Sequence, residues 1–176
     1  MNILLAGFGG QGILFAGKFL AYVGLFGGQE VSWLPSYGAE MRGGTANCSV
    51  ILSKELIGSP MVPHPDVFLC MNLPSLDKFE QTIVPGGMLL ADSSVITREP
   101  AREDIVYYAV PATRLAGEIG MVKLANMIMI GKLMAESGLC GLSEAERVMR
   151  SIIPENRGAM VAQNMRAIEM GYGWGR

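Results

Sequence analysis

The glycine-rich run Gly7-Phe8-Gly9-Gly10-Gln11-Gly12 is the first candidate for chemistry, with Gly7, Gly9, Gly10, Gln11 and Gly12 as its candidate binding residues. The run has the GxGxxG spacing and lies between a short apolar segment and a segment of helical periodicity, which is the context that phosphate binding requires. Glycines permit a tight turn, and a helix that starts there presents free N–H groups and a positive dipole to an anion. The alternative is that the glycines only let the helix pack closely against the strand.

A dinucleotide site would need one more feature, an acidic residue at the end of the second strand, about 20 residues after the glycines. Leu34 and Pro35 occupy that region, whereas Glu30 precedes the strand. The spacing therefore weakens the case for NAD.

A second candidate is the polar loop Pro35-Ser36-Tyr37-Gly38-Ala39-Glu40-Met41-Arg42-Gly43-Gly44-Thr45, in which Tyr37, Glu40, Arg42, Gly43 and Gly44 are candidate binding residues. Loops beyond the carboxyl ends of strands form the binding crevice of open α/β sheets. Glu40 and Arg42 are predicted to contact an anionic ligand or a neighbouring subunit. An internal ion pair that fixes the loop is the alternative.

Other reactive side chains favour structural roles. His64 lies between Pro63 and Pro65, with no serine, cysteine or second histidine nearby to form a catalytic pair. The three cysteines, Cys48, Cys70 and Cys140, are odd in number and too far apart for a metal motif, so we predict buried free thiols. No nucleophile and base can be paired from the sequence, and no catalytic or metal-binding residue is predicted.

The elements that must position the two candidate loops alternate along the chain. Apolar runs predict strands, and recurrences at helical spacing predict helices. Pro35 is expected to end the second strand, and Ser143 with Glu146 forms a capping-box pattern at a helix start. The strands fall at 2–6, 31–34, 45–52, 67–71, 88–91 and 105–110, and the helices at 12–24, 75–82, 113–118, 123–137, 143–149 and from about Glu155. This order predicts a single α/β domain over 1–176, a Rossmann-like three-layer fold with a mostly parallel sheet.

Composition agrees with a compact domain and excludes several classes of protein. Of 176 residues, 50% are hydrophobic and 17% are charged, which rules out intrinsic disorder. The net charge of −2 and the lack of a basic cluster argue against nucleic acid as a partner. The apolar stretch 121–134 is interrupted by Lys123, Asn126 and Lys132, so no membrane span is predicted, and the N-terminus lacks secretory features. The expected location is the cytoplasm.

Three motifs occur in the order found in one protein family. GFGGQG at the N-terminus, PSYGAEMRGGTANCSV after the second strand and MNLPSLDKF at 71–79 resemble the gamma subunit of 2-oxoacid:ferredoxin oxidoreductases, in the 2-oxoglutarate and ketoisovalerate branch. Asn126-Met127 is a fourth, weaker match, so the resemblance covers nearly the whole chain. PSYGxEMRGG is the most specific of these strings.

The resemblance implies a Rossmann-like subunit that is inactive alone. Its enzyme would oxidatively decarboxylate a 2-oxoacid, with 2-oxoglutarate as the leading candidate, form an acyl-CoA and reduce ferredoxin. In this family thiamine diphosphate with Mg²⁺ lies in the alpha and beta subunits, and [4Fe-4S] clusters lie in beta or in a ferredoxin-like delta subunit. No cofactor is expected to be held by this chain alone, although coenzyme A is a candidate contact.

The two loops suggest what this chain contributes. A phosphate-type turn and Arg42 in one half of the chain suggest that the glycine run and residues 37–44 cover the active site or bind part of coenzyme A. Three alternatives stay open: the small subunit of indolepyruvate:ferredoxin oxidoreductase, a stand-alone NAD(P)-binding Rossmann domain, and a binding module with no catalytic partner.

Overall fold

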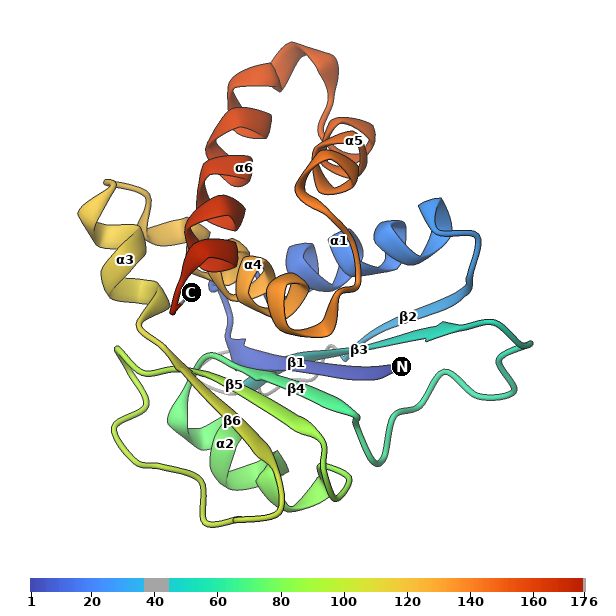
Figure 1. Ribbon diagram of the computed structural model, residues 1–176, viewed down its shortest axis with the longest axis vertical. Helices are drawn as coiled ribbons and strands as arrows, with labels where there is room; N and C mark the ends of the chain where they lie inside the picture. The colour runs from blue at the N-terminus through green and yellow to red at the C-terminus, as the bar shows by residue number, and fades with distance from the viewer. Residues whose placement is uncertain (37–44, 176) are drawn as a thin grey trace.

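A computed structural model describes residues 1–36 and 45–175, except for the side chain of Thr45. Its centre is a six-stranded sheet in the order β2-β3-β1-β4-β5-β6 (Figure 1). The strands are β1 (Asn2–Phe8), β2 (Glu30–Ser36), β3 (Thr45–Ser53), β4 (Val67–Cys70), β5 (Met88–Asp92) and β6 (Val106–Val110).

The sheet is parallel except at one edge. β1, β4, β5 and β6 are parallel, whereas β3 runs antiparallel to both of its neighbours, β1 and β2. No helix connects β2 to β3 in the described residues, and a short connection without a crossover helix joins antiparallel strands. The predicted mostly parallel α/β sheet is confirmed.

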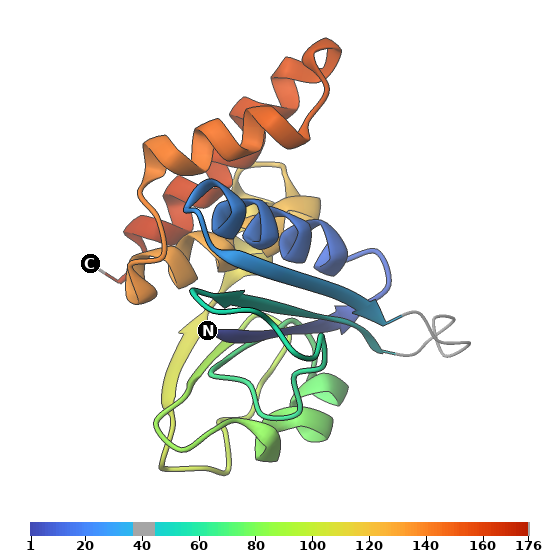
Figure 2. The same cartoon turned by 90° about the vertical axis from the view of Figure 1, so that its right-hand side faces the viewer.

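Helices form the outer two layers, but unequally. One face of the sheet carries α1 (Ile13–Phe26), α3 (Ala112–Glu118), α4 (Ala125–Ser137), α5 (Leu142–Ile152) and α6 (Gly158–Gly173) (Figure 1). The other face carries α2 (Leu73–Phe79) and the 3₁₀ turn η2 (Glu80–Thr82) (Figure 2). Two further 3₁₀ turns, η3 (Val122–Leu124) and η4 (Glu155–Arg157), precede α4 and α6.

Side chains of β1 contribute to the hydrophobic cores on both faces of the sheet. Ile3 and Leu5 belong to the larger core under α1 and α4, whereas Leu4 and Ala6 belong to the smaller core under α2. This alternation follows from the two-residue period of a strand. Because both faces are covered here, β1 reads as a continuous apolar run.

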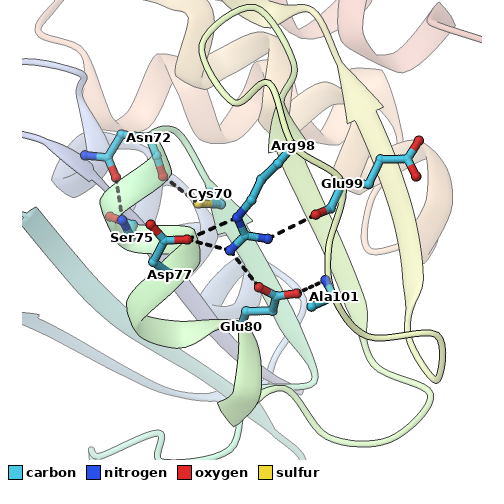
Figure 3. A network of polar contacts seen from close by, with 8 residues as sticks. All are labelled: Cys70, Asn72, Ser75, Asp77, Glu80, Arg98, Glu99 and Ala101. Atoms are coloured by element: carbon cyan, nitrogen blue, oxygen red, sulfur yellow. Dashed lines mark hydrogen bonds and ion pairs between the residues drawn. The ribbon is translucent and has the colours of Figure 1, made fainter.

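An ion network closes the layer around α2. The guanidinium of Arg98 contacts Asp77 of α2 and, at 2.8 Å, Oε2 of the buried Glu80 (Figure 3). The other oxygen of Glu80 accepts a hydrogen bond from the backbone N–H of Ala101. The network therefore ties the segment after β5 to α2 and η2, the helical elements that the described residues place on this face.

Two sequence predictions about element ends are wrong. Pro35 does not end the second strand, because β2 continues to Ser36. β2 is an edge strand, and on such a strand a proline whose nitrogen points away from the neighbouring strand costs the sheet no hydrogen bond. The predicted capping box is also absent, because α5 begins one residue earlier, with Gly141 as its N-cap and no side-chain cap.

The cysteines are buried as predicted, and methionines of α4 join them in the core. All three cysteines are free and buried, and Met127, Met129 and Met134 of α4 are fully enclosed. α4 lies between the sheet and α6, so apolar residues occur all around it. Among the described residues, no helix is both long enough and apolar enough to cross a membrane.

Candidate functional site

The glycine turn, residues 9–12, joins the end of β1 to the start of α1 (Figure 1). Gly10 and Gly12 have φ angles of +94° and +74°, a region that side chains other than glycine rarely adopt. Gly12 is also the N-cap residue of α1. The turn is therefore built from backbone conformations that require glycine at these two positions.

Gln11 holds the turn between two strands. Its Oε1 accepts a hydrogen bond of 2.6 Å from the N–H of Phe8, and its Nε2 donates one of 2.9 Å to the carbonyl of Met71. One amide group thus joins the end of β1 to the residue that follows β4. Gln11 is a positioning residue in this geometry, because its polar atoms are used in fixing the turn.

Asn126 of α4 is hydrogen-bonded to the turn. Its Nδ2 donates a hydrogen bond of 2.9 Å to the carbonyl of Gly12, and the residue is 2% exposed. A Cβ on Gly12 would lie 2.5 Å from that same nitrogen. A Cβ on Gly7 would likewise lie 2.6 Å from Oε1 of Gln11. Close packing therefore accounts for Gly7 and contributes at Gly12.

The start of α1 is open to a ligand. The first N–H groups of a helix have no partner within the helix, and α1 has neither a capping side chain nor an acidic residue in its first turn. A cavity of about 240 Å³, which we call the α1 hollow, adjoins it. The hollow is lined by Phe8, Gly9, Gly10, Gly12, Ile13, Leu14, Phe15 and Ala46. Close packing thus accounts for Gly7, whereas residues 9–12 leave the α1 start accessible, and anion binding there stays a prediction.

A second cavity, of about 210 Å³, also adjoins the turn, where the parallel strands end; we call it the strand-end hollow. It is lined by Gly10, Gln11, Met71, Val95, Thr113, Val122, Lys123 and Ala125. Lys123 is the one charged side chain among these residues. One hollow beside the turn thus has no charged residue in its described lining, and the other is lined by a cationic residue.

Tyr37, Glu40, Arg42, Gly43 and Gly44 lie outside the described residues, so the second candidate loop is known only by its ends. The register pairs Phe8 with Thr45 and Ser36 with Asn47. Both ends of the loop are therefore at the edge of the sheet where β1 enters the glycine turn. The structure therefore brings the two ends of this loop to the edge that carries the glycine turn.

The strand arrangement bears on the NAD alternative. β1 is flanked by β4 and by the antiparallel β3, and β2 is the edge strand beyond β3. β2 ends in Leu34, Pro35 and Ser36. Glu30 stands at the opposite end of β2. A carboxylate for a ribose hydroxyl is therefore missing from the described part of this edge.

Sequence reasoning missed the residues that come from distant parts of the chain. Lys123 of η3 lines the strand-end hollow, and the Met71 carbonyl is a partner of Gln11. A backbone acceptor leaves no trace in a motif, and Lys123 stood in what looked like an ordinary helix. Asn126 was part of a weak motif match, but its contact with Gly12 spans 114 positions and has no local signal.

The reactive side chains of the described residues are poorly placed for catalysis. Burial raises the pKa of Cys48 and of Cys70 to about 12, so both thiols are neutral near pH 7. His64 is exposed, with Nδ1 3.4 Å from the carbonyl of Thr82. Within residues 1–36 and 45–175, no three or more His, Cys, Asp or Glu residues group in a way that could hold a metal ion.

Comparison with known sequences extends over nearly the whole chain. The family model for pyruvate ferredoxin/flavodoxin oxidoreductase matches residues 2–174. Ketoisovalerate oxidoreductase subunit VorA of Methanothermobacter thermautotrophicus is 38% identical over all of this chain, which spans 36% of that relative. 2-Oxoglutarate synthase subunit KorC of Methanocaldococcus jannaschii is 33% identical over 97% of this chain and 91% of its own length.

Solved structures share the fold. The gamma subunit of a keto/oxoacid ferredoxin oxidoreductase from Geobacter sulfurreducens matches with a TM-score of 0.82 and 29% identity, over 97% of this chain and 95% of its own. A 2-oxoglutarate:ferredoxin oxidoreductase from Magnetococcus marinus, solved with 2-oxoglutarate, coenzyme A and succinyl-CoA, matches with a TM-score of 0.86 and 26% identity, over 98% of this chain and 30% of that one. The chain thus spans about a third of the length of the VorA relative and of the Magnetococcus chain.

Proposed function

The chain belongs to the pyruvate ferredoxin/flavodoxin oxidoreductase family, and we propose that it is the gamma-type component of a 2-oxoacid:ferredoxin oxidoreductase. The observation that carries this proposal is the match of the family model to residues 2–174, which include the glycine turn and the second loop. The reaction would convert a 2-oxoacid and coenzyme A into an acyl-CoA and carbon dioxide, with the electrons passed to ferredoxin.

The substrate we propose is 2-oxoglutarate. The KorC relative, named as a 2-oxoglutarate synthase subunit, aligns over nine-tenths of both chains. A branched-chain 2-oxoacid is the second candidate, because the VorA relative is 38% identical. An assay with both acids separates these candidates, since one carries a second carboxylate and the other an apolar branch.

Within that enzyme, we assign to this chain a role in positioning coenzyme A. The unpartnered N–H groups at the start of α1 and the Lys123 ammonium in the strand-end hollow suit phosphate groups. Arg42 would add a cation from the second loop, whose ends lie beside the turn. This arrangement binds and orients an anion, and it gives the chain no bond-breaking step of its own.

The cofactors of the reaction are assigned to partner subunits. Thiamine diphosphate with Mg²⁺ and [4Fe-4S] clusters would lie in alpha, beta and ferredoxin-like delta subunits. The cysteines described above are buried one by one in the core, so their arrangement does not suit a cluster. We therefore derive no step of the cofactor chemistry from residues of this chain.

The test is to co-purify the tagged chain anaerobically with its partners and to measure viologen reduction that depends on a 2-oxoacid and coenzyme A. Partner subunits that carry the cofactors, together with 2-oxoglutarate activity, would support the proposal. A chain that purifies alone and binds NAD(P) would overturn it, and a partnerless chain with no nucleotide affinity would favour the binding module.

Arg42→Ala in the assembled enzyme tests the coenzyme A role. We expect the KM for coenzyme A to rise about tenfold, which corresponds to the loss of about 1.4 kcal/mol of binding, with the KM for the 2-oxoacid unchanged. Arg150→Ala is the matched control, because Arg150 is an exposed α5 residue paired with Glu146. An unchanged KM for coenzyme A in Arg42→Ala would remove Arg42 from the site.

A further inference from the structure

One edge of the sheet is open and nearly free of charge. β2 is the outermost strand beside β3, and Figure 2 looks toward this edge, where no described segment crosses in front of the strand. Between Lys18 and Lys54 the described residues include one charged side chain, that of Glu30. Trp33 and Leu34 of β2 are 38% and 37% exposed. Such an uncharged edge is a surface on which another strand can pair.

The hydrogen bonds between β3 and β1 show which backbone groups of β2 face outward. Leu52 of β3 exchanges both of its backbone hydrogen bonds with Met1, so it faces β1. Residues of an antiparallel strand alternate between facing one neighbour and facing away from it. The residues of β2 opposite Leu52 and its alternate neighbours are Val31, Trp33 and Pro35, so these three face away from β3. Their carbonyls and the two N–H groups accept and donate no hydrogen bond within the described part of the chain.

This outward row is complementary to itself. When two copies of β2 run antiparallel about a two-fold axis at Trp33, the two Trp33 residues exchange both of their backbone hydrogen bonds. Each Val31 N–H then meets the Pro35 carbonyl of the other copy. All seven residues of each strand are paired in this register, and the missing N–H of Pro35 removes one donor at each end. Glu30 faces Ser36 of the second copy, so like charges do not oppose each other.

α1 holds this edge in place. A Cβ on Gly24 of α1 would lie 2.8 Å from the side chain of Val31, and one on Gly17 would lie 3.0 Å from the indole nitrogen of Trp33. An ordered strand loses less conformational freedom on pairing than a loose segment does. The two-fold axis also brings the exposed parts of two Trp33 rings together, and tryptophans at the centre of an interface supply much of its binding energy.

The opposite edge strand, β6, is protected against pairing. Pro111 follows it directly, and the segment before it carries Arg98, Glu99, Arg102, Glu103 and Asp104. Charges and prolines are the features that keep edge strands of natural proteins from pairing. A contact of β2 with β6 of another copy would also repeat without end, whereas a contact of β2 with itself closes as a dimer. The two edges together favour β2 as its own partner.

We propose that β2 is a self-pairing surface, on which a second copy of this chain adds its own β2 to form one continuous sheet across a two-fold axis at Trp33. The outward donors and acceptors, the sparse charge and the protected opposite edge all point to this occupant. The proposal does not depend on the oxidoreductase function, because it rests on the sheet edge alone.

The mass of the purified full chain in solution, measured by light scattering, is the first test. We expect twice the chain mass of 18.9 kDa. Ser32 of one copy faces Leu34 of the other in the proposed register, so the double variant Ser32→Lys/Leu34→Lys places lysines directly opposite each other, which is destabilising. It should be monomeric. Val106→Lys is the matched control, because Val106 is an exposed residue of the other edge strand, and it should stay dimeric.

Cysteine pairs test the register. Residues 32 and 34 of opposite copies form a pair without backbone hydrogen bonds, in which the Cα atoms lie about 4.5 Å apart, close enough for a disulfide. A mixture of Ser32→Cys and Leu34→Cys chains, oxidised with glutathione disulfide, should give a linked dimer. Either variant alone should link several-fold less, because equal positions lie diagonally. A mixture of Ser32→Cys and Val106→Cys is the control and should not link.

Several results would overturn the proposal. A natural chain that is monomeric would do so, including the case in which β2 pairs only with a different polypeptide. A dimer that survives in Ser32→Lys/Leu34→Lys, or a cysteine mixture that links no better than its control, would place the contact elsewhere in the molecule. The mass of the natural chain and the cysteine mixtures do not require the lysine variant, so they decide the matter even if that variant does not fold.

Discussion

Gly131 of α4 and Gly171 of α6 occupy reciprocal positions where the two helices cross. A Cβ on Gly131 would overlap the carbonyl oxygen of Ile168, and a Cβ on Gly171 would overlap that of Ile128. The backbones of the two helices therefore touch at this crossing. Only glycine permits so close an approach. α4 also packs on the sheet, and its Asn126 donates a hydrogen bond to the glycine turn. The crossing therefore helps to fix the position of α4, and with it the position of Asn126 beside the turn.

Gly131→Ala and Gly171→Ala should each lower the free energy of unfolding by about 3 kcal/mol or more, because the added methyl group meets backbone that cannot turn aside. Gly158→Ala is the control, since a Cβ there meets nothing within 4 Å and alanine favours the helix. Urea denaturation of the three variants makes the comparison. Equal stability of Gly131→Ala and Gly158→Ala would show that the helices can separate at little cost.

The network around α2 predicts a contrast between two acidic residues that bind the same arginine. The side chain of Glu80 is 4% exposed and that of Asp77 is 57% exposed. Glu80→Gln should cost about 2–3 kcal/mol, because an amide N–H₂ would face the Arg98 guanidinium in a buried place. Asp77→Asn should cost less than about 1 kcal/mol, because water screens that pair. Denaturant unfolding gives both values, and similar losses would contradict the role of burial.

The buried thiols predict a stability loss at high pH. Burial raises the folded-state pKa of Cys48 and of Cys70 from 9.0 to about 12. Since the neutral thiol is the form that the fold favours, this contribution is complete below pH 9 and is lost as the pH rises from 9 toward 12. The slope is about 1.4 kcal/mol per pH unit for each thiol. Unfolding free energies measured between pH 8 and pH 11 should show it.

Thiol labelling checks the same point by a separate route. At pH 8 a disulfide reagent should react with the native chain at least about a hundredfold more slowly than with the chain in urea, because the thiolate is suppressed and access is blocked. Fast labelling of Cys48 or Cys70 in the native chain would mean that the core around β3 and β4 opens readily.

The sequence predicted the fold where local patterns decide it. The strand predicted at 2–6 and the glycine turn after it follow from residues that are neighbours in the chain, and both are confirmed. Pro35 misled the prediction because its effect depends on β2 being an edge strand, which is a property of the whole sheet. Gly131 and Gly171 show no local signal, since their role depends on a crossing of two helices.

The site was predictable in part for the same reason. The run from Gly7 to Gly12 predicts a turn from its local sequence. Lys123 and the carbonyl of Met71 are brought near that turn only by the tertiary fold. Asn164 illustrates the limit, because an asparagine within an ordinary helical pattern does not reveal that its carbonyl oxygen is buried and unpartnered. The motif predicted the turn, and packing supplied its neighbours.

The hydrogen bonds of Lys132 join the end of α6 to α4. It is 6% exposed, and its Nζ donates hydrogen bonds to Glu136 at 2.6 Å and to the carbonyl of Trp174 at 2.9 Å. Lys132→Met should cost about 2–4 kcal/mol and shift the Trp174 fluorescence toward that of exposed indole, read in a Trp33→Phe background. Arg150→Met removes a comparable helical pair that is exposed, and it should cost less than about 0.5 kcal/mol.

Gln11→Glu tests whether the amide of Gln11 sets the glycine turn. The new carboxylate can still accept from the N–H of Phe8, but its second oxygen would face the carbonyl of Met71, where an N–H now donates. We expect a loss of about 2 kcal/mol at pH 7, because one bond is replaced by a repulsion. Lowering the pH should restore part of that loss, since a protonated carboxyl can donate to Met71 again. Gln163→Glu, an exposed change of the same kind, should show no such recovery. A loss in Gln11→Glu that does not depend on pH would mean that the Met71 contact contributes little, and that Gly10 and Gly12 determine the turn through their backbone angles alone.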